Sequence, residues 1–324
     1  MNKQFNTLFI AKEKQSNQLS ILVQRQMKAL GTTNNSLQIE QNVCKGTGIP
    51  GYISIYKNLK KFLRQKDFDL IHAHYSLIGT ITLLARKKEK VVVSFMGSDV
   101  YFNGFIFKFA RWFVLKKADH IIVKSDTLLK KLPQQKNISV IPNGINMELF
   151  RPVDKAKAKE EVGWNQDKVH ILFPAGKNRY EKNYPLAEQA ITELGKKYPV
   201  ALHLLEHIAP DEVPIFLNAA DIVLLTSRWE GSSNVTKEAM ACNTVVVSTD
   251  VGDAGELFRN LAGYFTTNHS VEDVVVKLEQ AVAFCKENSS TQGRQRILDA
   301  GLDDATMAKK LYKVYMQISD TRNE

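Results

Sequence analysis

Residues 222–242 read IVLLTSRWEGSSNVTKEAMAC, and this stretch contains the local unit from which the fold is built. The apolar run Ile222–Leu225 is typical of a short, fully buried strand. The small and capping residues Gly231–Asn234 stand just before a run with helical spacing, so they predict the start of a helix. A buried strand, a polar loop and a helix in that order indicate a parallel sheet that is covered on both faces.

The same alternation runs along the whole chain. In the first half, apolar runs predict strands at residues 7–11, 36–39, 69–73, 91–95, 120–123 and 139–141. In the second half, they predict strands at residues 170–173, 201–205, 222–225 and 244–248. Helical spacing separates them, notably at residues 19–30, 52–63, 184–198, 213–220 and 235–242.

This pattern predicts an α/β protein with two Rossmann-like, doubly wound domains that face a cleft. The turn signal and the charged run around residue 150 place the boundary between residues 1–149 and residues 150–324. A last helix at about residues 306–320 is expected to pack on either domain, including back on the first. In such a pair, ligands bind at the carboxyl ends of the strands, so the loops that follow strands are the places to seek chemistry.

The composition is that of a folded, water-soluble protein. Apolar residues make up 44% of the 324 residues and charged residues 24%, which argues against a disordered chain. The N-terminal residues lack the apolar core of a secretory signal, and no apolar run is long enough to span a membrane. The scattered cysteines Cys44, Cys242 and Cys285 predict neither a metal site nor a disulfide framework, so we expect a cytoplasmic protein.

Positive charge is concentrated in the first half. Residues 1–150 contain 23 Lys and Arg but 9 Asp and Glu, a net charge of +14, whereas the rest of the chain has 21 basic and 25 acidic residues, a net charge of −4. This asymmetry suggests that the first half faces an anionic partner, either a membrane surface, a lipid phosphate or a nucleic acid. Ordinary solubilising charge is the alternative interpretation.

The segment after the predicted strand 222–225 suits an elongated anionic ligand. Free backbone N–H groups at the helix start beyond Gly231–Asn234 favour an anion such as a pyrophosphate. Glu230 stands before this helix and Glu238 about a turn inside it, so the two carboxylates can serve different parts of one ligand. One can face a sugar, while the other accepts hydrogen bonds from ribose hydroxyls. A capped surface helix with an incidental Glu is the alternative.

A basic loop follows the predicted strand 170–173. Within Gly176–Asn183, the side chains of Lys177, Arg179 and Lys182 cluster where a ligand phosphate would lie. Arg offers a fork of donors and Lys a point charge, and both suit a diphosphate that must leave. A solvated loop with no ligand is the alternative.

Together these segments resemble the family-4 retaining glycosyltransferases of the GT-B fold. The pair Glu230 and Glu238 matches their E-x7-E pattern, and Gly176–Lys182 matches their G-R-x-x-x-E-K loop, with Lys177 where Arg is usual. Further matching segments are Asp221, Ala239–Ala241, Val251–Asp253, Ile141–Asn146, Ile71–Tyr75 and Gly97–Val100. The resemblance covers nearly the whole chain.

The resemblance implies a retaining, metal-independent transfer of a hexose from a nucleotide-diphosphate sugar, with no cofactor. A glycan or lipid-linked acceptor in cell-surface polysaccharide biosynthesis is the family's commonest theme, and we take uracil as the donor base. Arg179 and Lys182 would stabilise negative charge on the leaving diphosphate, and Glu230 would hold the donor sugar. The remaining donor-binding residues implied are Lys177, Gly231, Ser232, Ser233, Asn234, Val235 and Glu238.

The acceptor side departs from the family pattern in two places. Met96 stands where the family often has a His, and the first loop, residues 12–18, lacks the family's glycine pair. The candidate acceptor-side residues are Gly97, Ser98, Asp99, His74 and Ser16.

The segment Tyr101–Lys117 interleaves aromatic with basic residues. Its aromatic side chains include those of Phe105, Phe109 and Trp112. Taken alone, they are best explained as the core face of an ordinary helix. Combined with the positive charge of the first half, they lead us to expect weak peripheral contact with an anionic membrane.

Other functions on this architecture make different demands. A sugar-nucleotide epimerase binds the same kind of donor but needs no acceptor, and a non-catalytic binder does not need Glu230 for chemistry. A dinucleotide-dependent oxidoreductase needs a G-x-G-x-x-G turn after the first strand, where this chain has no glycine. Only the charge suggests a nucleic-acid-binding protein, and since no recognition motif accompanies it, no nucleic-acid partner is expected.

Overall fold

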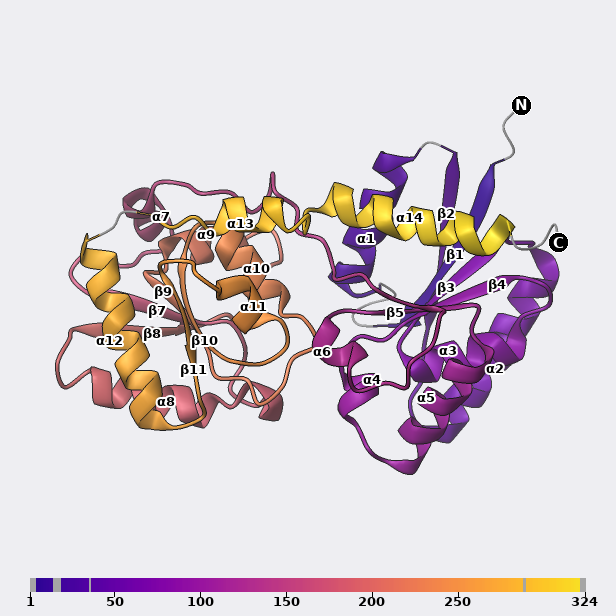
Figure 1. Ribbon diagram of the computed structural model, residues 1–324, viewed down its shortest axis with the longest axis horizontal. Helices are drawn as coiled ribbons and strands as arrows, with labels where there is room; N and C mark the ends of the chain where they lie inside the picture. The colour runs from indigo at the N-terminus through magenta and orange to yellow at the C-terminus, as the bar shows by residue number, and fades with distance from the viewer. Residues whose placement is uncertain (1–3, 14–18, 35, 288–289, 321–324) are drawn as a thin grey trace. The chain divides into compact units, whose positions relative to one another are not determined.

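The computed structural model describes residues 4–13, 19–34, 36–287 and 290–320, and the chain folds as two compact units (Figure 1). The first unit contains the chain up to Gly144 together with the segment from Asp304 onward. The second unit is Ile145–Asp303. The chain therefore enters the second unit a few residues before the boundary predicted from the sequence, and its last helix belongs to the first unit.

The first unit is built on a six-stranded parallel sheet in the order β2-β1-β3-β4-β5-β6. The strands are β1 (Phe5–Lys12), β2 (Leu37–Cys44), β3 (Leu70–His74), β4 (Lys90–Ser94), β5 (His120–Val123) and β6 (Ile138–Val140). In β1, the successive residues Leu8, Phe9 and Ile10 are all fully buried. Both faces of this strand are therefore covered, which explains why its sequence reads as a continuous apolar run.

Helices cover both faces of this sheet (Figure 1). They are α1 (Ile21–Thr33), α2 (Gly48–Gln65), α3 (Ser76–Ala85), α4 (Ser98–Tyr101), α5 (Phe105–Lys117), α6 (Asp126–Leu129) and α14 (Asp304–Asp320). Helices α2, α3 and α5 pack together over one face, while α1 packs against α14. The hydroxyl of Tyr315 in α14 lies 2.6 Å from Nδ1 of the buried His72, so α14 is anchored in the core of the first unit.

The second unit is built on a five-stranded parallel sheet in the order β11-β10-β9-β7-β8. The strands are β7 (Val169–Phe173), β8 (Val200–Leu204), β9 (Ile222–Leu225), β10 (Val245–Thr249) and β11 (Tyr264–Thr267). The helices are α7 (Lys155–Glu161), α8 (Tyr184–Leu194), α9 (Val213–Ala219), α10 (Asn234–Ala241), α11 (Ala254–Phe258), α12 (Val271–Glu287) and α13 (Gly293–Asp299). Helices α8 and α12 enclose one apolar core with the sheet, whereas α7 pairs with α9 and α10 with α13.

The predicted α/β class with two parallel sheets is confirmed, and every predicted strand is present. The prediction missed β11 because its four residues, Tyr264–Thr267, include two threonines and give no apolar run. It also missed α3, which is buried at seven of ten positions and therefore lacks an amphipathic pattern. Helix α12 has an ordinary amphipathic pattern that the prediction overlooked.

Helix α5 differs from the simplest interpretation of its sequence, which made the aromatic residues its core face. Within α5 only Ala110 and Val114 are buried, while Phe105 is 84% exposed and Trp112 is 55% exposed. Ala110 and Val114 are buried because α5 packs closely against α3, where a Cβ added to Gly79 would lie 3.3 Å from Val114. In the part of the chain that the structure describes, no helix has both the length and the hydropathy needed to cross a bilayer.

Candidate active site

The predicted donor-side residues lie in the second unit, on loops that follow two neighbouring strands. Strand β7 pairs with β8 on one side and with β9 on the other. The chain leaves β7 toward β8 and later returns to β9, so the loops after β7 and β9 diverge at the carboxyl edge of the sheet. Open α/β sheets bind ligands at such a point, where the strand order reverses.

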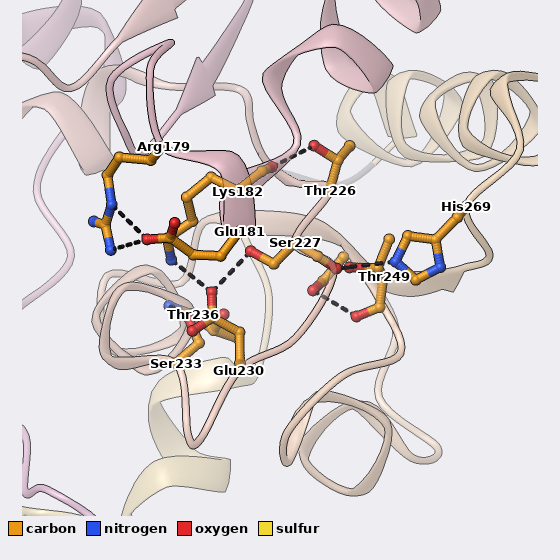
Figure 2. Close-up of polar contacts among 11 residues, drawn as sticks. Arg179, Glu181, Lys182, Thr226, Ser227, Glu230, Ser233, Thr236, Thr249 and His269 are labelled. Atoms are coloured by element: carbon orange, nitrogen blue, oxygen red, sulfur yellow. Dashed lines mark hydrogen bonds and ion pairs between the residues drawn. The ribbon is translucent and has the colours of Figure 1, made fainter. Parts of the chain in front are cut away.

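An ion pair joins these two loops (Figure 2). Nζ of Lys182 lies 2.5 Å from Oε1 of Glu230, and the hydroxyl of Ser227 donates a hydrogen bond to the same oxygen at 2.8 Å. Both charged side chains are largely shielded, with 11% of Lys182 and 16% of Glu230 exposed. Charges removed from water in this way need a partner, so the pair holds two side chains from distant parts of the sequence in one geometry.

Further hydrogen bonds, made by side chains, hold the two loops together. The hydroxyl of Thr226 donates to the carbonyl oxygens of Lys182 and Asn183, each at 3.0 Å. Asn183 has left-handed backbone angles (φ 55°, ψ 47°) and ends the short 3-10 turn Tyr180–Lys182. Its side-chain oxygen accepts a hydrogen bond from Arg228 at 2.8 Å. Asn adopts this conformation more readily than most residues, so the turn that presents Lys182 follows from the local sequence.

The other two basic residues of the predicted cluster point elsewhere. Arg179 is largely exposed and binds Glu181, with Nη2 2.6 Å from Oε1. Nζ of Lys177 lies 5.0 Å from the centre of the Tyr184 ring, in a cation–π contact. The structure therefore brings Lys182 to Glu230, while Arg179 and Lys177 are held by neighbours on their own loop or on α8. A ligand phosphate would have to attract Arg179 away from Glu181.

The loop before α10 contains the residue that caps this helix, and buried oxygen atoms without hydrogen-bond partners lie around the helix start. Oγ of Ser233 accepts a hydrogen bond from the backbone N–H of Thr236 at 3.3 Å, which caps the helix. Three buried oxygens around this helix start have no partner among the described residues: Oδ1 of Asn234, Oγ1 of Thr236 and Oδ1 of Asp253. Buried oxygens without partners are uncommon, so the protein around this helix start is not fully hydrogen-bonded by its own groups.

Asp253, on the loop after β10, forms a hydrogen bond with the segment that follows Glu230. Its Oδ2 accepts a hydrogen bond from Ser232 at 2.6 Å. The preceding Gly252 has a left-handed φ of 67°, and a Cβ there would lie 3.2 Å from Cβ of Glu230. Burial raises the pKa of Asp253, and the opposing attraction of Lys237 is insufficient to cancel that effect. The sequence matched Val251–Asp253 to the family pattern without indicating this contact.

We expect Asp253→Asn to stabilise the protein at neutral pH and to have little effect in acid. A carboxyl group whose pKa is raised by folding stabilises the fold while it is protonated, and this contribution is lost as pH rises through the folded-state pKa. Asn imitates the protonated form, so the melting temperature of the variant should begin to exceed that of the wild type as pH rises past the ordinary aspartate pKa, and the difference should be complete above the raised folded-state pKa. Thermal unfolding from about pH 3 to about pH 8 measures the difference. A variant that is less stable than the wild type at neutral pH would show that the charge attraction to Lys237 dominates.

The second carboxylate of the predicted pair lies inside α10. Glu238 and its neighbour Lys237 are both buried, and Lys237 was not a sequence candidate. The negative charge of Glu238 also contributes, after burial, to raising the pKa of the Cys242 thiol to about 12. Glu230 on the loop and Glu238 in the helix therefore occupy different surroundings, as the prediction required, with the predicted residues Gly231–Asn234 and Val235 between them.

Two further side chains from strand ends contact the site and were missed. The hydroxyl of Thr249, at the end of β10, donates to the carbonyl oxygen of Ser227 at 2.7 Å. Nε2 of His269, just after β11, lies 3.0 Å from the same oxygen (Figure 2). Polar residues at the carboxyl ends of parallel strands meet at one edge, so this rule, applied to the predicted strand 244–248, would have selected Thr249. It could not have selected His269, because β11 was not predicted.

The acceptor-side candidates lie in the first unit. Asp99 is buried and accepts hydrogen bonds from the backbone N–H groups of Ser76 and Met96, at 2.5 and 2.7 Å. His74 is also buried, 3.0 Å from the Gln26 side-chain oxygen, and burial lowers its pKa to about 3. Both side chains are therefore engaged inside the unit. The remaining candidates Gly97 and Ser98 begin α4, while Ser16 lies outside the described residues.

Two family models match the chain. The model of the glycosyl transferases group 1 matches residues 188–291, and that of glycosyltransferase family 4 matches residues 24–149. An uncharacterized glycosyltransferase of Methanocaldococcus jannaschii is 30% identical over 66% of this chain and 65% of its own length. The D-inositol 3-phosphate glycosyltransferase of Kribbella flavida is 23% identical over 71% of this chain and 66% of its own length. The chain thus spans about two thirds of the length of these relatives.

A third curated relative and two solved structures match more of the chain. The phosphatidylinositol N-acetylglucosaminyltransferase GPI3 subunit of Saccharomyces cerevisiae is 23% identical over 86% of this chain and 70% of its own length. Sucrose-phosphate synthase from Thermosynechococcus elongatus has a TM-score of 0.81 at 17% identity and covers 98% of this chain and 100% of its own. Anabaena HepE, solved in complex with UDP and glucose, has a TM-score of 0.76 at 15% identity, and the match covers 97% of this chain and 100% of HepE. At these identities the two structures establish the fold.

Proposed function

We propose that this chain, which belongs to the family-4 glycosyltransferases of the GT-B fold, transfers a sugar from a nucleotide-diphosphate sugar to an acceptor hydroxyl. The observation that carries the proposal is the Lys182–Glu230 pair. It stands where the loops after β7 and β9 diverge, beside the start of α10. A cation and a carboxylate at this point can act on the two sides of a sugar–phosphate bond.

The transfer we propose retains the configuration of the sugar and needs no metal ion. The bond between the anomeric carbon and the diphosphate oxygen breaks, and the acceptor oxygen bonds to the same face of that carbon. The acceptor proton passes to the departing phosphate oxygen. Lys182, joined by Arg179 once it leaves Glu181, stabilises the negative charge that grows on the diphosphate, which is the task a divalent cation performs in other transferases.

The carboxylates divide the rest of the donor between them. Glu230, already oriented by Lys182 and Ser227, accepts hydrogen bonds from hydroxyls of the transferred sugar. Glu238 accepts hydrogen bonds from the ribose. Backbone N–H groups of Gly231–Asn234 face the diphosphate, since a helix start favours anions.

A UDP-sugar is the donor we propose. The structural neighbour Anabaena HepE was solved with UDP and glucose. We place the donor base beside the loop that follows β8, where Glu206 stands. In this chain the Glu206 carboxylate accepts a hydrogen bond from the backbone N–H of Lys177 at 3.1 Å, so it is held beside the basic loop Gly176–Asn183. A Cβ on Gly176 would overlap the Glu206 carboxylate, so the two residues lie in direct contact.

We expect UDP and a UDP-sugar to raise the melting temperature of the full chain more than the matching GDP and ADP compounds. A ligand that binds only the folded state stabilises it by about 2.7 kcal/mol at one hundred times its dissociation constant. The measurement is a thermal-shift panel of these nucleotides, repeated with EDTA to test independence from metal. No shift with any nucleotide would contradict the proposal. Incubation with the donor alone, if it gave a new sugar nucleotide, would indicate an epimerase.

The acceptor we propose is a glycan or a lipid-linked glycan of the cell surface, met in the cytoplasm at the inner face of the membrane. The name of the yeast relative specifies phosphatidylinositol, which is a lipid. The first 150 residues of this chain carry a net charge of +14, with 23 basic and 9 acidic side chains, and α5 exposes aromatic residues. Both features support peripheral contact with an anionic membrane.

A further inference from the structure

Helices α2, α3 and α5 of the first unit enclose an apolar groove. Its volume is about 450 Å³, within the range of pockets that bind small molecules. The side chains that line it are mostly aliphatic or aromatic, among them Ile49, Ile53, Leu77, Leu84, Ile106 and Phe109. The three helices pack together on one face of the sheet, so the residues that line the groove belong to one helical layer of the unit (Figure 1).

Exposed apolar side chains extend from this groove. Ile49 and Ile53 on α2, Leu84 on α3, and Ile106 on α5 line it and are each at least half exposed. Phe105 and Trp112 continue the exposed surface along α5, where the Phe109 and Trp112 rings lie 5.8 Å apart. Scattered exposed apolar residues are ordinary, but a continuous surface of this kind marks a binding site.

The charges on the same helices are all positive. Helices α2 and α5 carry four Lys and Arg residues each, α3 carries none, and none of the three contains Asp or Glu. Exposed examples are Lys57 and Lys61 on α2 and Lys108 and Lys116 on α5. A second copy of this chain placed on the groove would bring two positive surfaces together, which disfavours a symmetric dimer. An anionic bilayer complements both the apolar surface and the charge.

We propose that the α2–α3–α5 groove receives a hydrocarbon chain of a lipid in an anionic bilayer. The inference rests on the peripheral membrane contact proposed above and deepens it by naming the surface and the lipid part that enters it. Phe105 and Trp112 sit at the boundary between headgroups and hydrocarbon, the lysines face lipid phosphates, and one hydrocarbon chain leaves the bilayer to fill the groove. This arrangement holds a lipid-linked acceptor by its apolar part and leaves its polar part free.

The first test is vesicle flotation of the full chain. We expect binding to phosphatidylcholine vesicles that contain about one third phosphatidylglycerol, with at least about tenfold weaker binding to phosphatidylcholine alone. Raising NaCl from about 0.1 M to about 1 M should weaken it, because the screening length falls from about 10 Å to about 3 Å. No binding to anionic vesicles would overturn the proposal, as would a dimer in light scattering that buries this face instead.

Substitutions test whether vesicle binding depends on this surface or on any exposed apolar residue. The double variant Phe105→Glu, Trp112→Glu should lose vesicle binding by at least about tenfold, since two apolar side chains no longer enter the bilayer. Val276→Glu is the matched control, because Val276 is a similarly exposed apolar residue of α12 in the second unit. Equal loss in both variants would overturn the proposal. The thermal shift with UDP is measured in parallel and reports on the second unit, so a failure of the proposed transfer is distinguished from a failure of membrane docking.

Entry of a hydrocarbon chain into the groove needs its own readout. Phosphatidylglycerol that carries a photoreactive diazirine in its acyl chain should label residues of α2 and α3 that line the groove. Ile53→Trp fills the groove from α2 and should abolish that labelling. The variant should still bind vesicles, because Phe105 and Trp112 on α5 are unchanged. Labelling confined to α5, or unchanged in Ile53→Trp, would overturn the assignment of the groove.

Discussion

Replacing Lys182 by Ala is expected to lower kcat for sugar transfer by about 10²–10³-fold, the usual effect of removing one group that stabilises developing negative charge. Lys182 is the one residue of the predicted basic cluster that the structure pairs with Glu230, at 2.5 Å. The substitution removes both the cation for the leaving diphosphate and the partner that orients Glu230. The measurement is initial rates at saturating donor, with the melting temperature and UDP affinity determined on the same preparation.

Two controls make this result specific. Lys196→Ala removes an exposed lysine of the same unit, paired with Glu193 at 2.6 Å, and should leave kcat unchanged. Lys182→Arg keeps the charge but not the geometry, so it should retain more activity than Lys182→Ala. Activity of Lys182→Ala within about threefold of the wild type would refute the proposed role, given the effect that such groups usually have.

Replacing Asp221 by Ala is expected to lower the free energy of unfolding by about 3–5 kcal/mol, because it leaves a buried cation without its partner. Asp221 Oδ2 lies 2.9 Å from Nζ of Lys159, and it accepts a hydrogen bond from the backbone N–H of His170 at 2.8 Å. The Lys159 side chain is 7% exposed and that of Asp221 13% exposed. This contact ties α7 to strands β7 and β9, which carry the site. Urea denaturation followed by tryptophan fluorescence measures the change.

The matched control for this prediction is Lys155→Ala. Lys155 also pairs with Asp221, at 3.3 Å, but its side chain is 39% exposed, so its loss should cost less than about 1 kcal/mol. Asp221→Asn keeps an acceptor for the His170 N–H and should fall between the two. If Asp221→Ala and Lys155→Ala destabilise the protein equally, the buried Lys159 is not the cause.

The fold could be predicted largely from local patterns. The segments Val91–Phe95 and Ile222–Leu225 are apolar runs typical of a doubly covered parallel sheet, and both are strands within a residue or two. Helix α3 could not be predicted in this way, since burial on nearly all sides erases the periodicity that marks a helix. The exposed aromatic face of α5 could not be predicted either, because it depends on how closely α5 approaches α3, where a Cβ on Gly79 would lie 3.3 Å from Val114.

The residues of the candidate site could be selected from the sequence, but their contacts could not. The spacing of Glu230 and Glu238, and the basic loop after β7, led to the prediction of the donor side. The structure then separated the basic residues, with Lys182 on Glu230 and Arg179 on Glu181. It also added Thr249 and His269, which are distant in sequence and reach the carbonyl oxygen of Ser227 from neighbouring strand ends.

By itself, the sequence determined the α/β class, because periodicity and caps are local properties. It also led to the prediction of a division of the chain near residue 150 and of the residues for a diphosphate sugar. Only the tertiary structure decided which charged side chains form ion pairs, which polar groups are buried and hydrogen-bonded within a unit, and which apolar side chains remain exposed to water. Asp99 and His74 illustrate the second point, since both are buried and bonded within the first unit. These outcomes depend on the order of strands in a sheet and on how closely two helices approach, and neither is written in any single stretch of the chain.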